Sequence, residues 1–122
     1  MNSKNIYNTV AIIGGGLIGS SLLLSIKENS LCKILKIYDS NSDVRDKLKT
    51  ITEPSNVFTN IEESVKDSDL VVLCIPVGSM KETAKKISKI LKVGCILTDT
   101  GSTKSSVIDD IKSHLSENIF FI

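Results

Sequence analysis

Aromatic residues are scarce in this sequence of 122 residues: they make up 4% of it, and tryptophan is absent. A core must therefore be built from isoleucine, leucine and valine. No excess of charge of one sign is present either, with 15 Lys and Arg against 14 Asp and Glu, so nothing favours nucleic acid or an anionic membrane as a partner. No apolar run approaches the roughly 20 residues that cross a bilayer. We therefore expect neither class of partner.

Cysteine is also sparse, and its three residues lack the paired short spacing of zinc sites and disulfide scaffolds. They are Cys32, Cys74 and Cys95. We expect all three to be small buried apolar residues of a reduced, cytoplasmic protein, and we expect no metal site. The N-terminus does not resemble a signal peptide, because residues 1–8 are polar and glycines break the apolar stretch that follows.

What the sequence does contain is an alternation of short β-rich runs with longer amphipathic stretches. Strands are expected at 7–13, 33–38, 56–59, 69–75, 95–99 and 118–122. Helices are expected at 17–28, 41–50, 61–66, through Met80 to Leu91, and at 102–115. Strands that alternate with helices imply right-handed crossovers and a parallel sheet. The sequence predicts one doubly wound α/β domain over residues 1–122, with a mostly parallel sheet.

Helical spacing predicts which faces are buried. In the first helix, Leu17, Ser21 and Leu24 are spaced to pack against a sheet. The helix after Pro76 carries its apolar residues at Met80, Ala84, Ile87 and Leu91. The lysines between them are expected to form a solvated face: Lys81, Lys85, Lys86 and Lys89.

The run GGGLIG between the first strand and the first helix matches G-x-G-x-x-G in the context that makes this motif typical of dinucleotide binding. Gly14 permits the tight turn, and Gly16 lets a pyrophosphate approach a backbone that has no Cβ. Gly19 lets the helix pack close to the strand. The alternative is a glycine-rich turn that serves only to reverse the chain.

The start of the first helix adds a reason to expect phosphate. The free N–H groups near Leu17 and Ile18 would point at the phosphates, and the helix dipole favours negative charge there. Gly15 is expected to be optional and to add only flexibility.

Asp39 ends the second strand, 20 residues after Gly19, which is close to the spacing expected for the acid that binds the adenosine ribose. Its carboxylate would also repel a 2′-phosphate, so NAD is favoured as the cofactor. Ser40 follows in the same site. NADP is the alternative, because Ser40 and Asn41 are small and polar and Arg45 could lie nearby. The alternative interpretation of Asp39 is a solvated residue at the end of a strand, with no role in binding.

Two further strand ends meet at the same edge of a doubly wound sheet, where ligands bind. After the fourth strand, Ile75, Pro76 and Val77 are expected to line the path of the cofactor, although they would equally serve as a strand terminator. After the fifth, Ser102 is suited to cap a helix. Its hydroxyl would alternatively face the nicotinamide end of the cleft and touch substrate. His114, near the far end of the last helix, is not expected to be catalytic.

Four segments together resemble the NAD-binding domain of prephenate and arogenate dehydrogenases. They are VAIIGGGLIGSSLLLSIK (10–27), IYDSN (37–41), DSDLVVLCIPVGS (67–79) and LTDTGSTKSSV (97–107). The resemblance covers nearly the whole chain and implies a Rossmann-type NAD(P)-binding fold. It also implies oxidative decarboxylation of a cyclohexadienyl acid, with hydride passing to the nicotinamide. Ser102 matches the Gly-Ser position of the family, beside the ring hydroxyl of the substrate.

The resemblance also sets an expectation for the isolated chain. In the family, a strand like NIFFI runs into a Gly-Gly-His-Pro turn and a helical C-terminal domain, whereas this sequence stops at Ile122. We expect the chain to bind NAD and to turn over prephenate or arogenate poorly unless a C-terminal domain completes it. The sequence predicts no oligomeric state. Two alternatives are a dehydrogenase of the β-hydroxyacid or imine-reductase kind and a non-catalytic nucleotide-binding module.

Overall fold

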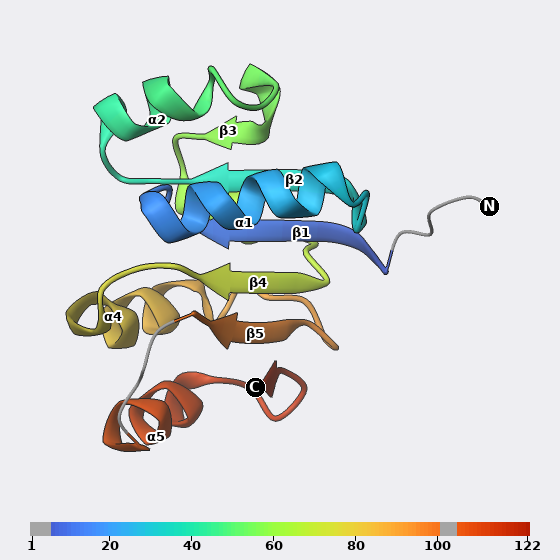
Figure 1. Cartoon of the computed structure of the whole chain (residues 1–122). Helices are drawn as coiled ribbons and strands as arrows, with labels where there is room; N and C mark the ends of the chain where they lie inside the picture. Colours follow the sequence, from blue (N-terminus) through green and yellow to red (C-terminus); the bar gives the residue numbers. More distant parts are fainter. Residues whose placement is uncertain (1–5, 101–104) are drawn as a thin grey trace.

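The fold is built on a sheet of six parallel strands in the order β3-β2-β1-β4-β5-β6 (Figure 1). A computed structural model describes residues 6–100 and 105–122. The strands are β1 (Tyr7–Ile13), β2 (Cys32–Tyr38), β3 (Val57–Phe58), β4 (Leu70–Leu73), β5 (Ile96–Asp99) and β6 (Phe120–Phe121). Because all strands run the same way, their carboxyl ends meet along one edge.

Helices connect the strands. They are α1 (Leu17–Glu28), α2 (Ser42–Leu48), α3 (Ile61–Val65), α4 (Val77–Ile87) and α5 (Ser105–His114), with a short 3-10 turn η1 (Pro54–Asn56). The Asn41 side chain caps α2 by accepting from the N–H groups of Asp43 and Val44, and the Asn60 side chain caps α3 by accepting from the N–H of Glu63. No helix within residues 6–100 and 105–122 is long and apolar enough to span a membrane.

The helices cover the two faces of the sheet with separate apolar cores. On one face, Leu23 and Ile26 of α1 and Leu48 of α2 pack with Val10 and Ile12 of β1. The opposite core joins residues of α3, α4 and α5 to Ala11 and Ile13, the alternate residues of β1. The prediction of a doubly wound α/β fold with a parallel sheet is confirmed.

The burial of α1 differs from the expected pattern. Its buried residues are Gly19, Leu23 and Ile26, whereas Leu17 is 86% exposed and Leu24 is 44% exposed. The prediction that Leu17, Ser21 and Leu24 face the sheet was wrong. The physical reason is Gly19, because the closest approach of helix and strand occurs where no Cβ intervenes, and this contact sets the rotation of the helix.

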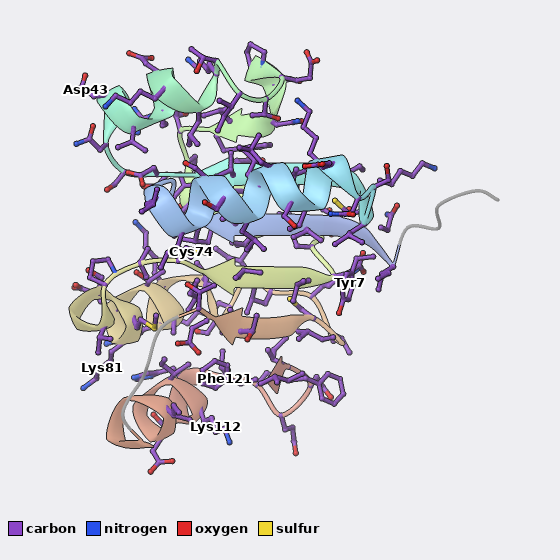
Figure 2. All side chains as sticks on the ribbon, in the orientation of Figure 1. Tyr7, Asp43, Cys74, Lys81, Lys112 and Phe121 are labelled. Atoms are coloured by element: carbon purple, nitrogen blue, oxygen red, sulfur yellow. The ribbon has the colours of Figure 1, made fainter. Side chains whose placement is uncertain are left out.

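The cysteines are less buried than expected. Cys95 is fully buried, but Cys32 and Cys74 are only half-buried, and all three are free thiols. Cys74 lies just after β4, at the end of the sheet where the strand arrows of β1 and β4 finish (Figure 2). The sequence pattern missed this exposure because β4 is shorter than the predicted strand 69–75, so Cys74 belongs to the edge.

Candidate functional site at the carboxyl edge of the sheet

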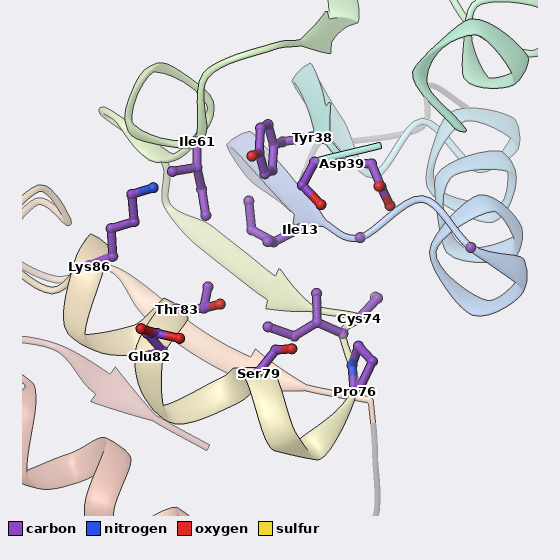
Figure 3. Close-up of a pocket in the computed structure, with 14 residues that line it drawn as sticks. Ile13, Tyr38, Asp39, Ile61, Cys74, Pro76, Ser79, Glu82, Thr83 and Lys86 are labelled. Carbon is purple, nitrogen blue, oxygen red and sulfur yellow. The ribbon is translucent and has the colours of Figure 1, made fainter. Parts of the chain in front are cut away.

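A cavity of about 670 Å³ opens at the carboxyl ends of β1, β2 and β4 (Figure 3). It lies where the connection from β1 leads to α1 on one face and the connection from β4 leads to α4 on the other. Such a switch point leaves a crevice between the two connections, and ligands of doubly wound sheets bind there. The volume is within the range of small-molecule sites.

The glycine turn forms one wall of this cavity and is held by close backbone contacts. Gly14 has a φ of +108°, and a Cβ there would lie 2.2 Å from the Cys74 carbonyl oxygen. A Cβ on Gly19 would lie 1.8 Å from the carbonyl oxygen of Gly14. Both positions therefore require glycine for the fold itself: Gly14 for the turn beside β4, and Gly19 for the packing of α1.

Gly16 differs from these two glycines. A Cβ there would meet no atom within 4 Å, and its φ of −70° suits any residue. Gly16 lines the cavity and precedes α1, which begins without a side-chain cap. The backbone N–H groups of the first helical residues, Leu17 and Ile18, are therefore not satisfied by a capping side chain. The empty space beside Gly16 and these N–H groups suit an anion.

Asp39 lies opposite the glycine turn and is fixed to it. One carboxylate oxygen accepts the Gly15 N–H at 2.8 Å, and the other accepts the Asn41 N–H at 2.9 Å. Arg45 donates from Nη1 to the main-chain oxygen of Asp39 at 2.8 Å. The carboxylate is thus oriented before any ligand arrives, with Ser40 exposed beside it in the lining.

Gly15 is more constrained than the sequence indicated. Its N–H orients Asp39, and a Cβ at this position would lie 2.6 Å from Leu48 Cδ1. A side chain on Gly15 would push against Leu48 of α2, so this position has less room than the expectation of an optional glycine implied. A glycine motif alone does not reveal this contact, which depends on where α2 packs.

The end of β4 supplies another wall. Cys74, Ile75 and Pro76 line the cavity, whereas Val77, the first residue of α4, is 40% exposed and is not among the lining residues. Burial raises the pKa of the Cys74 thiol, and a hydrogen bond with the Thr100 side chain offsets part of that rise. The thiol is therefore largely protonated near neutral pH.

No histidine is present in the part of the cavity lining that the structure describes. His114, the last residue of α5, does not line it. Ser102, the predicted substrate-contacting residue, lies outside the described residues. Within residues 6–100 and 105–122, no three His, Cys, Asp or Glu side chains gather in a way that would hold a metal ion.

One wall of the cavity was not expected from the sequence. Four polar residues of α4 line it, and Tyr38 and Ile61 lie across from them. The four are Ser79, Glu82, Thr83 and Lys86. We expected Lys86 to belong to a solvated face; it is exposed, but it also borders the cavity. Their spacing of three and four residues, on a stripe adjacent to the buried one, was the available signal.

Comparisons with known proteins identify the family to which the chain is similar. Residues 22–122 match the family described as "Prephenate dehydrogenase, nucleotide-binding domain". Cyclohexadienyl dehydrogenase of Zymomonas mobilis is 37% identical over 114 residues, which are 93% of this chain and 39% of that protein. Prephenate dehydrogenase of Lactococcus lactis is 33% identical over 104 residues, which cover 82% of this chain and 28% of that protein. The chain thus spans well under half the length of these relatives.

A solved structure gives the same result at the level of the fold. Prephenate dehydrogenase from Aquifex aeolicus, in complex with hydroxyphenyl propionate and NAD⁺, superimposes with a TM-score of 0.80 at 28% identity. The match covers 92% of this chain and 40% of that one. The sheet order of the chain is that of a Rossmann-type fold. The chain belongs to the prephenate dehydrogenase family and carries its nucleotide-binding domain.

Proposed function

We propose that the cavity binds NAD. The pyrophosphate would lie against Gly14 and Gly16 and the N–H groups of Leu17 and Ile18, and Asp39 would accept hydrogen bonds from the adenosine ribose. The observation that carries this proposal is the open space at Gly16, next to an uncapped helix and across from an oriented carboxylate. Gly19 contributes by bringing α1 close to β1.

The same residues favour NAD over NADP. A 2′-phosphate would lie against the carboxylate of Asp39, whose position is fixed by two backbone N–H groups. Arg45, the nearby cation, donates to a main-chain oxygen. Binding NADP would require the carboxylate of Asp39 to turn away, which would break its two hydrogen bonds with backbone N–H groups.

We propose further that the protein acts on prephenate or arogenate. The reaction would transfer a hydride from the substrate ring to the nicotinamide, release carbon dioxide and leave an aromatic ring. Ile75 and Pro76, which line the cavity, would border the path of the cofactor, and Ser102 would touch the ring hydroxyl. Membership of the family supports this reaction over that of a β-hydroxyacid or imine-reductase dehydrogenase or a non-catalytic module.

We expect little turnover from the 122 residues alone. No imidazole lies in the described lining to accept the hydroxyl proton, and the chain spans only 39% of a relative such as the Zymomonas enzyme. Prephenate-dependent formation of NADH by the purified chain is therefore expected to be weak or absent. Turnover at a rate typical of complete dehydrogenases would contradict this expectation.

Calorimetric titration with NAD and NADP tests the cofactor proposal. The Asp39→Asn variant should bind NAD about tenfold more weakly, because a charged acceptor is lost, and its preference for NAD over NADP should shrink. Asp43→Asn is the matched control, since Asp43 is an exposed acid at the start of α2 outside the cavity lining. Thermal unfolding of each variant checks the fold. Failure of the unmodified chain to bind either cofactor would overturn the proposal.

A further inference from the structure

We infer that Glu82 and Lys86 of α4 recognise the base of the dinucleotide and select adenine. This inference rests on the proposed binding of NAD in the same cavity. We assign to Asp39 the selection of NAD over NADP at the ribose. Glu82 and Lys86 would add a second selection, for adenine, at the base. The class of ligand is therefore a dinucleotide whose purine carries an amine at C6, as adenine does.

The first support is the position of the two residues. Glu82 and Lys86 are one helical turn apart and line the cavity together. The opposite side of α4 is anchored, because Met80, Ala84 and Ile87 are completely buried against the sheet. The polar side is therefore presented to the cavity by a helix that cannot rotate without exposing its core residues.

The second support is the direction in which the ligand would extend. Asp39 and Pro76 lie at one end of the cavity, and Ile61 and Lys86 lie at the other (Figure 3). A dinucleotide with its pyrophosphate at the glycine turn and its ribose at Asp39 would continue toward that second end. Ile61 at that end provides a buried aliphatic side chain for a flat base, and Tyr38, which lies between Ile61 and Asp39 in Figure 3, provides an aromatic ring.

The third support is that both charges are free. Glu82 and Lys86 are exposed, and neither forms a hydrogen bond or an ion pair with the part of the chain that the structure describes. Some other charged groups are engaged within the protein: Lys92 pairs with Asp69, and Lys36 donates to two main-chain oxygens. Glu82 and Lys86 therefore have acceptors and donors to offer a ligand.

The chemistry of the pair matches the edge of adenine. Its exocyclic amine donates, and its ring nitrogens accept. A carboxylate can only accept, and an ammonium can only donate, so Glu82 suits the amine and Lys86 suits a ring nitrogen. Hypoxanthine and guanine carry a carbonyl oxygen where adenine carries the amine. That oxygen would face the Glu82 carboxylate without a proton between them.

Titration with NAD and with nicotinamide hypoxanthine dinucleotide tests the inference. The unmodified chain should bind NAD about tenfold more tightly, the difference expected for one hydrogen bond to a charged group at an open site. Glu82→Gln should remove this difference, because an amide both donates and accepts. Lys86→Met keeps the length of the side chain and should weaken the binding of NAD several-fold.

Two control variants change the same charges elsewhere. They are Glu28→Gln, at the end of α1, and Lys85→Met, on α4. Lys85 is next to Lys86 but does not line the cavity. Both should bind the two dinucleotides as the unmodified chain does. Equal affinity of the unmodified chain for the two dinucleotides, or an unchanged preference in Glu82→Gln, would overturn the inference while leaving NAD binding intact. No binding of NAD at all would instead overturn the proposed function.

Discussion

At the residue scale, the glycines of the turn separate folding from binding. Gly16→Ala adds a methyl group that would meet no protein atom within 4 Å, so the variant should fold with nearly unchanged thermal stability. The same methyl group would occupy the space that we assign to the pyrophosphate. We therefore expect its affinity for NAD to fall by at least tenfold, measured by calorimetry. A variant that binds NAD normally would contradict this position of the phosphates.

Gly19→Ala is the matching substitution at a position where an added methyl group should destabilise the fold. Its methyl group would lie 1.8 Å from the Gly14 carbonyl oxygen, which is backbone and cannot move aside cheaply. We expect the free energy of unfolding to fall by about 3 kcal/mol, a size typical of overpacking at a buried position. Denaturant unfolding measures it. A Gly19→Ala protein as stable as Gly16→Ala would show that α1 can shift away from β1.

The thiols of Cys74 and Cys95 should differ in their reactivity toward a thiol reagent. Burial raises the pKa of Cys95 to about 11, so at pH 8 it carries almost no thiolate and should resist a thiol reagent in the folded protein. Cys74 also has a raised pKa, but it borders the cavity and is half-exposed. It should react slowly, and saturating NAD should slow it further. Mass spectrometry of the labelled peptides distinguishes the two. Equal labelling of Cys74 with and without NAD would contradict the proposed position of the ligand.

At the element scale, Asp69 ties together three chain segments at the amino edge of the sheet. Its carboxylate accepts the Thr9 N–H of β1 at 2.9 Å and pairs with Lys92, in the connection between α4 and β5. These contacts lower the pKa of Asp69, chiefly through the hydrogen bond with Lys92 and then through the N–H of Thr9. The stabilisation is therefore present above the ordinary pKa of an aspartate, which is about 3.9.

Because the pKa of Asp69 is lowered in the folded state, the stability of the protein should depend on pH in the acid range. As the pH falls through the lowered pKa of Asp69, the contribution of this carboxylate to stability should be lost. Asp69→Asn should be less stable than the unmodified chain at pH 7, and the gap between their melting temperatures should narrow toward pH 3. Melting curves across this range measure it. A gap that stays constant would mean that Asp69 stabilises the fold by packing and not by charge.

The elements also show how far sequence patterns extend. The strands and helices could be predicted because continuous apolar runs and helical spacing are local properties. The face of α1 that is buried could not, since Leu17 and Leu24 fit the same period as Leu23 and Ile26, and only the Gly19 contact decides between them. The polar side of α4 was missed for a similar reason. A solvated helix face and the wall of a cavity have the same composition.

At the scale of the whole molecule, the cavity joins parts that otherwise form separate cores. The glycine turn and Asp39 could be predicted because one motif encodes them, and the edge of the sheet could be predicted from the topology. The contribution of Ile61 and Glu82 depends on α3 and α4 packing side by side, which is a tertiary property. A ligand in this cavity would contact both halves of the sheet.

Binding should therefore stabilise the molecule as a unit. A ligand that binds only the folded state, at one hundred times its dissociation constant, adds about 2.7 kcal/mol to the free energy of unfolding. For a domain of this size the melting temperature should rise by roughly 10 °C. Because both cores share β1, with Ile12 facing one and Ile13 the other, unfolding should remain a single transition. Differential scanning calorimetry with and without NAD measures both quantities. Gly16→Ala is the control, since it should melt like the unmodified chain without NAD and, with an affinity reduced tenfold, show only about half the rise with NAD. Two separated transitions, of which NAD shifts only one, would mean that the halves fold independently and that the ligand contacts only one of them.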